Sequence, residues 1–179
     1  DLRTSRGLGD VYKRQQRRGG QGKAAASVKE EDLIQNLYVL SSHVQILCFT
    51  TKGKVYWLKV YEIPVASRTS KGRPLVNMLN LDDDERVSDI LPVEEFTDKR
   101  FIFMATRKGI TKKTNLSLFE RKWKSGIKAI NLDEDDKLIG TAITDGTNEI
   151  LLASSAGKLI RFKESKVRAM GRTARGVKG

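Results

Sequence analysis

An internal repeat constrains this chain more than any other feature of its sequence. An apolar strand-like run, a short polar turn, a glycine and a second strand recur three times, with the turn glycines at Gly53, Gly109 and Gly157. A second glycine follows 19, 17 and 19 residues later. In the first two copies an acidic run (82–85 and 133–136) and another strand-like stretch come next. Landmarks that recur together in this order indicate repeated structural units that pack on their neighbours.

The length of the repeat favours β structure. The turn glycines are 56 and 48 residues apart, and each copy contains about four short β segments, which is typical of propeller-like blades. Helical repeats of similar length need long segments with 3.6-residue periodicity, and none is visible. We predict an all-β, propeller-like fold with repeats at about 37–93, 94–144 and 145–179. Because ring propellers usually need at least four blades, we expect the chain to be part of a longer ring.

The first 15 residues do not share this pattern. They show neither strand alternation nor a helical face, and the stretch 10–15 looks like a translated sequencing-adapter remnant. We expect residues 1–15 to be a foreign, disordered leader and residues 16–179 to form the domain.

The charge of the chain points to its partner. The formal net charge is +12 at pH 7, which favours a polyanion. No apolar run resembles a membrane-spanning helix, and no apolar segment follows the basic start as in a signal peptide. We therefore expect no membrane partner.

The scarcity of cysteine and histidine limits the chemistry of the chain. With one of each, neither an intramolecular disulfide nor a structural zinc site can form. Cys48 lies in an apolar run and is expected to be a buried thiol in a reducing, cytoplasmic compartment. His43 is expected in a turn at the end of a strand at 37–40. Since no Ser-His-Asp arrangement or P-loop is present, we expect no catalytic residue, metal or cofactor in this chain.

A short basic loop precedes the repeats. Paired arginines supply forked donors for phosphate oxygens, and glycines let a backbone approach closely. A flexible basic linker would have a similar composition. The candidate DNA contacts of this loop are Gln16, Arg17, Arg18, Gly19, Gly20, Gly22 and Lys23.

Basic residues also cluster within each repeat, at the turn and after the second strand, whereas acids gather in the two acidic runs. Repetition of this asymmetry should place positive charge along one rim and negative charge elsewhere, so that a bent duplex could follow the basic rim. Trp57 is expected in the core, and Trp123, between Lys122 and Lys124, at the surface. The candidate DNA contacts in the repeats are Lys52, Lys54, Arg68, Lys71, Arg73, Arg107, Lys108, Lys112, Lys113, Lys158, Arg161, Arg168 and Arg172.

The basic loop and the repeats together resemble the C-terminal domain of the bacterial DNA gyrase A subunit, over about residues 16–179. The heptad Gln-Arg-Arg-Gly-Gly-Gln-Gly at 16–22 is similar to the family's gyrase A box, although Gln21 stands where the family usually has a basic residue. The Gly72-Arg73-Pro74 turn and the segment Phe162-Lys163-Glu164-Ser165 are also similar to family landmarks.

The resemblance implies a six-bladed β-pinwheel, of which this chain would hold about three blades. Such a domain wraps double-stranded DNA on its basic rim so that the holoenzyme introduces negative supercoils. The holoenzyme would be an ATP-hydrolysing type II topoisomerase of two A and two B subunits, associated with the nucleoid in the bacterial cytoplasm. Its cleavage tyrosine and its sites for ATP and Mg²⁺ would lie outside this chain.

Three alternatives stay open. The topoisomerase IV subunit shares the blade architecture, but its box is typically degraded, so the intact glycines of residues 16–22 favour gyrase. A protein-interaction propeller could have an incidentally basic surface. An RNA-binding surface would more often show exposed aromatic rings at stacking positions.

Overall fold

The structure, a computed structural model, describes residues 34–67, 70 and 72–179. The chain forms two compact units, residues 1–36 with 65–72 and residues 37–64 with 73–179. All of the described strands and helices belong to the second unit, and the described residues of the first unit form neither. The described helices are short 3-10 turns, so the prediction of an all-β chain is confirmed.

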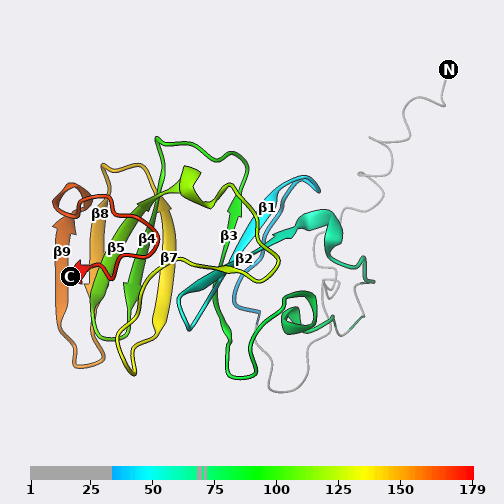
Figure 1. Cartoon of the computed structure of the whole chain (residues 1–179), viewed down its shortest axis with the longest axis horizontal. Coiled ribbons are helices and arrows are strands. Elements are labelled where there is room, and N and C mark those ends of the chain that lie inside the picture. Colours follow the sequence, from blue (N-terminus) through cyan, green and yellow to red (C-terminus); the bar gives the residue numbers. More distant parts are fainter. Residues whose placement is uncertain (1–33, 68–69, 71) are drawn as a thin grey trace, which may run out of the picture. The chain divides into compact units, whose positions relative to one another are not determined.

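The first four-stranded sheet is built mainly from the first repeat. Its strands are β1 (Gln45–Thr50), β2 (Lys54–Lys59), β3 (Val87–Val93) and β6 (Ile127–Lys128). Their order is β3-β1-β2-β6, and neighbouring strands are antiparallel. β1 therefore lies between its hairpin partner β2 and the strand that follows the acidic run (Figure 1).

The second sheet repeats this arrangement. Its strands are β4 (Phe101–Thr106), β5 (Ile110–Asn115), β7 (Leu138–Thr144) and β10 (Val177–Lys178). The order β10-β5-β4-β7 matches the first sheet strand for strand, with antiparallel pairing throughout. The two sheets are two blades of the repeat that the sequence predicts.

The third repeat contributes a hairpin, β8 (Glu149–Ala153) paired with β9 (Leu159–Lys163). The three hairpins turn at Gly53, Gly109 and Gly157, whose φ angles are 72°, 78° and 75°. This left-handed backbone region favours glycine because a Cβ atom would be crowded there. The turn glycines predicted from the sequence therefore have the role that was expected of them.

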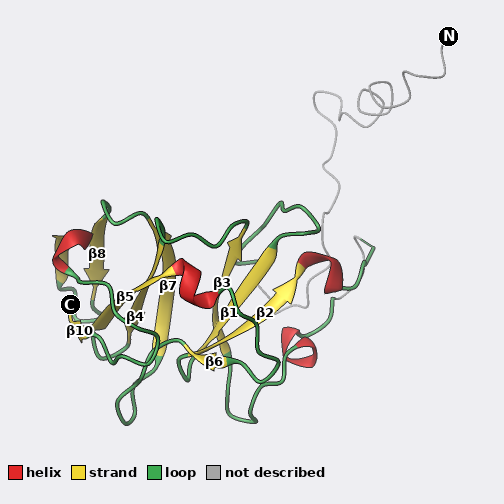
Figure 2. Cartoon of the chain, turned by 45° about the horizontal axis from the view of Figure 1, so that its top comes forward, coloured by secondary structure: helices red, strands yellow, loops and turns green. Residues whose placement is uncertain are grey.

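A 3-10 turn follows the second strand of each hairpin; these turns are η1 (Val60–Glu62), η3 (Leu116–Phe119) and η4 (Glu164–Lys166). A further turn, η2 (Leu75–Met78), lies between the second glycine and the acidic run of the first repeat. From η3 and η4 the chain runs back to the previous blade, where it adds the outermost strand (Figure 2). Val55 of β2 pairs with Ile127, and Thr111 of β5 pairs with Val177. Each complete sheet is thus finished by a strand from the following repeat.

The same exchange recurs in single hydrogen bonds. The carbonyl oxygen of Gly53 accepts from the amide of Ala129 at 2.8 Å, and that of Gly109 accepts from the amide of Gly179 at 2.9 Å. Because the contacts are equivalent in both blades, the junction between repeats is itself a repeated structure.

The main core lies between the first two sheets. Successive β1 residues point to opposite faces, so that β1 contributes to two clusters. One cluster joins Leu47 and Phe49 to Ile102 and Met104 of β4, and the other joins Ile46 and Cys48 to Tyr56 and Leu58.

Several residue predictions can be checked against this core. Cys48 is fully buried as expected, and burial raises the pKa of its thiol to about 12. Trp57 packs against the core, and His43 lies in a turn. The predicted strand at 37–40 is wrong, because this segment forms no ladder and the side chains of Leu37 and Val39 are exposed.

Candidate nucleic-acid interface

The basic residues of the first hairpin turn face the acidic run of their own repeat. Lys54 Nζ lies 2.8 Å from Asp82 Oδ2, and Lys52 forms an ion pair with Asp84. These contacts arise because β1 pairs with both β2 and β3, which brings the β1–β2 turn beside the turn that enters β3. The contact with Lys52 lowers the pKa of Asp84, and the contact with Lys54 lowers that of Asp82.

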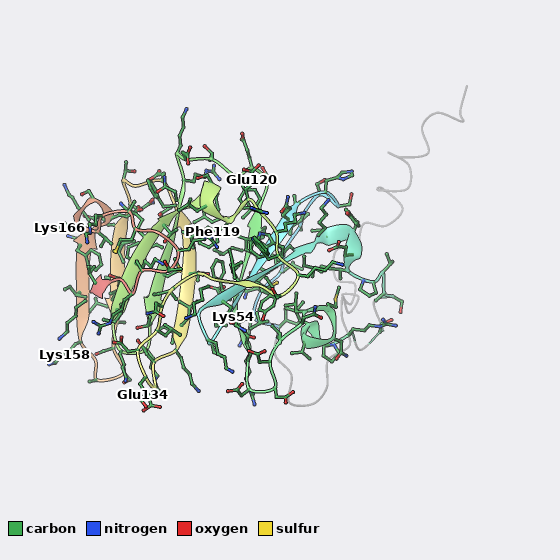
Figure 3. All side chains as sticks on the ribbon, viewed as in Figure 1. Lys54, Phe119, Glu120, Glu134, Lys158 and Lys166 are labelled. Atoms are coloured by element: carbon green, nitrogen blue, oxygen red, sulfur yellow. The ribbon has the colours of Figure 1, made fainter. Side chains whose placement is uncertain are left out.

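The second repeat has the same juxtaposition. The Arg107 guanidinium donates to the carbonyl oxygen of Asp135 at 2.7 Å, and the Lys108 ammonium donates to that of Glu134. Figure 3 shows Lys54, Glu134 and Lys158 at one edge of the strands. The expected segregation of turn lysines from acids is therefore wrong, since this edge carries both signs of charge.

A buried carboxylate ends each acidic run. Glu85 accepts hydrogen bonds from the hydroxyls of Thr50 and Tyr56, at 2.5 and 2.9 Å. Asp136 occupies the corresponding place in the second repeat and accepts from the amide of Lys108 at 3.0 Å. The last acid of each run therefore helps to fix the turn, while the acids before it are mostly exposed.

Two predicted DNA contacts lie in the interior instead. Lys112 is fully buried, and its ammonium donates to the carbonyl oxygens of Ala129, at 2.7 Å, and Arg172. Lys113 is also buried, and its ammonium lies 3.7 Å from a Glu164 carboxylate oxygen. Placing both lysines on the surface was wrong, because β5 is covered on both faces and each ammonium has acceptors inside.

The loops that follow the 3-10 turns carry the exposed basic residues. Glu120, the first residue after η3, and Lys166, the last residue of η4, lie at the edge opposite to Lys54 and Glu134 (Figure 3). Across the described residues, no ion pair involves a basic side chain of the loop at 120–128. The exposed basic side chains of the two loops are Arg121, Lys122, Lys124, Lys128, Lys166, Arg168 and Arg175, of which Arg175 pairs with Asp133.

The remaining predicted contacts fall into three groups. Arg73, Lys158 and Arg168 are exposed. Arg161 is exposed and forms an ion pair with Glu149 at 3.3 Å, and Arg172 is half-buried. The residues Gln16, Arg17, Arg18, Gly19, Gly20, Gly22, Lys23, Arg68 and Lys71 lie outside the described part of the chain.

Sequence reasoning singled out the turn lysines and gave less weight to the loop at 120–128. Composition alone does not separate the two sets, since both are lysine-rich segments beside a glycine. The first turn and the loop at 120–128 also both lie in repeats that contain an acidic run, so the pairing of the turn lysines with acids appears only where β1 meets β3 in space.

The described residues offer no other obvious chemistry. Residues 34–67, 70 and 72–179 contain no cluster of three His, Cys, Asp or Glu side chains that could hold a metal ion. In the same part of the chain, no helix has the length and apolar character needed to span a membrane.

The chain consists of antiparallel blades that exchange their outer strands, and basic loops lead into those strands. These features define a repeat domain of the β-propeller class with exposed cationic loops. The family model for the DNA gyrase C-terminal domain, a β-propeller, matches residues 14–41, 45–94, 100–145 and 148–179. The chain belongs to this family.

Curated relatives agree with this assignment. The DNA gyrase A subunit of Salmonella typhimurium is 54% identical over 164 residues, which cover 92% of this chain and 19% of the relative. The same gyrase protein of Escherichia coli K12 is 52% identical over the same shares of the two chains. The chain thus spans about a fifth of the length of the relatives that it matches.

Solved structures share the fold. The C-terminal domain of a DNA topoisomerase IV superposes with a TM-score of 0.71 at 32% identity, covering 77% of this chain and 43% of that one. A DNA gyrase A C-terminal domain superposes with a TM-score of 0.63 at 23% identity, covering 78% of this chain and 44% of that one. The propeller-like architecture predicted from the repeat is confirmed.

Proposed function

We propose that this chain is a DNA-binding and DNA-wrapping module of a DNA gyrase A subunit. The observation that carries the proposal is the loop at 120–128, which runs into the exchanged strand β6. Its residues Arg121, Lys122, Lys124 and Lys128 are exposed and form no ion pair within the described part of the chain. Cations in such positions are available to neutralise phosphates of a duplex on the outer face of the blades.

The proposal extends to the longer protein. Its complete form would act with two B subunits and a second copy of itself, and it would hydrolyse ATP with Mg²⁺ bound outside this chain. DNA held on the basic surface would present a neighbouring segment to strand passage in a fixed handedness. The location would be the cytoplasm, with the nucleoid.

A topoisomerase IV subunit is the second candidate, favoured by the superposition at a TM-score of 0.71 and 32% identity. The curated relatives at 52–54% identity are gyrase subunits, which favours gyrase. The two candidates differ in activity, because only gyrase introduces negative supercoils into relaxed DNA.

The decisive experiment changes the basic segment at 16–23 within the complete gyrase protein. Replacing Arg17 and Arg18 by alanine removes two forked phosphate donors from that segment. We expect supercoiling of relaxed plasmid to be lost while ATP turnover without DNA persists. Paired replacement of Lys52 and Lys54, which face acids, is the matched control and should leave supercoiling intact. Full supercoiling by the arginine variant would contradict the role assigned to the segment.

A further inference from the structure

The loop at 120–126 is fixed at both ends to the preceding blade. The Trp57 indole donates from Nε1 to the carbonyl oxygen of Phe119 at 2.8 Å, just before the loop. At its other end, Gly126 lies against the ring of Tyr56, and the next residue, Ile127, pairs with Val55. The basic residues in between are therefore presented from a defined position over β2.

Within this loop one arginine makes a cation–π contact with one tryptophan. The Arg121 guanidinium lies over the Trp123 ring, with its central carbon 4.8 Å from the ring centroid. Trp123 is 46% exposed and also lines a cleft of about 150 Å³ with Trp57 and Leu79. The indole is thus held partly by the blade and offers a face to the guanidinium.

This contact leaves the guanidinium available to a ligand. The cation–π contact uses the charge of the guanidinium and engages no oxygen or nitrogen acceptor, so its forked N–H donors remain for a ligand. In the described part of the chain, no hydrogen bond or ion pair uses the Arg121 side chain. The contact also removes rotamer freedom before a ligand arrives, which lowers the entropic cost of binding.

The surroundings of this arginine are predominantly positive. Lys122 is next in sequence, and partial burial and the nearby charge of Lys59 lower its pKa against the smaller opposing effect of the Glu62 carboxylate. Lys59 Nζ lies 5.1 Å from the centre of the Tyr61 ring, at the end of β2. Cations that converge from two repeats favour a bound anion over a bound cation.

Building on the proposed function, we propose that Arg121 is a phosphate clamp for duplex DNA and that Trp123 is its positioning residue. The guanidinium would bind two oxygens of one backbone phosphate at the junction of the first two blades. A phosphate is favoured over a base as the ligand, because the guanidinium already covers a face of the indole on which a base would stack.

The experiment compares three variants of the full chain, titrated with a long duplex at several salt concentrations. Arg121→Gln removes one phosphate contact, so the log–log salt slope should become shallower by about 0.9. Trp123→Ala removes no charge: we expect the slope to stay as in the wild type, while affinity falls about 3- to 10-fold. Lys137→Gln, the same charge change on the acidic edge, should leave both unchanged.

A second variant guards against a folding defect. Trp123→Phe keeps a ring beneath the guanidinium and should recover most of the affinity that Trp123→Ala loses. If Trp123→Ala does not fold, as judged by circular dichroism, the pair Arg121→Gln and Trp123→Phe decides: only the first should change the slope.

Two results would overturn the inference: unchanged affinity in a folded Trp123→Ala variant, or an unchanged slope in Arg121→Gln. Failure of the proposed function looks different, since the wild-type chain itself would then bind long duplexes without salt dependence.

Discussion

Lys112 and Lys113 are consecutive residues of β5, and their side chains leave the strand on opposite faces. Lys113 reaches the carboxylate of Glu164 on one face, whereas Lys112 reaches only carbonyl oxygens on the other. Burial, and to a lesser degree the charge of Arg172, lower the pKa of Lys112 to about 8. Burying a lysine side chain whose only acceptors are neutral costs more free energy when the side chain is a charged ammonium than when it is a neutral amine.

This difference predicts a pH dependence of stability. In the unfolded chain Lys112 regains an ordinary pKa, so between pH 8 and 10 the unfolded state binds more protons than the folded state. Lys112 should therefore raise the free energy of unfolding as pH rises through this window, by about 2–3 kcal/mol in total. Urea unfolding of wild type and Lys112→Met at pH 7, 8, 9 and 10 measures the effect.

The comparison must be made as a difference between the two proteins. Cys48 and Tyr56, whose pKa values are each raised to about 12 in the folded chain, act in the opposite direction at high pH in both. Wild-type stability minus that of Lys112→Met should grow from pH 7 to pH 10. A difference that stays constant with pH would contradict the assignment.

At the scale of the elements, the exchanged strand depends on a glycine. Gly126, just before β6, has a φ of 69°, and a Cβ atom there would lie 2.7 Å from the Tyr56 ring. That ring is buried and its hydroxyl is bonded to Glu85, so it has no room to move. Gly109 has a similar φ of 78°, but a Cβ there would meet nothing within 4 Å.

These two glycines form a matched pair for mutation. Gly109→Ala should cost about 1–2 kcal/mol, the usual penalty of a left-handed backbone. Gly126→Ala should cost this amount and about 1–3 kcal/mol more, since the added methyl group overpacks the junction. Urea denaturation of the two variants measures the difference. Equal losses would show that β6 tolerates displacement from the first blade.

The repeat pattern in the sequence predicted most of the hairpins and strands. Hairpins around Gly53, Gly109 and Gly157 were predictable because a short apolar run followed by a polar turn with a glycine is a local signal. The segment at 37–40 was wrongly predicted as a strand because a short apolar run does not reveal whether a partner strand is nearby.

For the molecule as a whole, charge is distributed by edge. The hairpin turns share one edge with the acidic runs, and the basic loops cross from the opposite edge to the exchanged strands (Figure 3). An edge that carries both signs of charge attracts phosphates weakly, because the acids cancel much of the positive electrostatic potential of the neighbouring lysines. Cations without an ion-pair partner retain that potential. DNA affinity should therefore depend on the loops far more than on the turns.

Two double variants with equal charge changes test this distribution. Lys122→Gln with Lys124→Gln should make the log–log salt slope of duplex binding shallower by about 1.8, two phosphate contacts in all. Lys52→Gln with Lys54→Gln should leave the slope within about 0.3 of wild type, because these lysines already face Asp84 and Asp82. Equal effects of both pairs would mean that DNA binding follows net charge alone.

The sequence by itself determined the repeat, the hairpin glycines, the all-β class and the basic character, because each is a local pattern or a sum over the chain. Only the tertiary structure decided three further features. The strands β6 and β10 each complete the sheet of the preceding repeat, Lys112 and Lys113 lie in the interior, and the turn lysines face acids. These outcomes depend on which segments meet in space. Val55 and Ile127 pair across 72 positions of sequence, and no pattern within either strand specifies that partner.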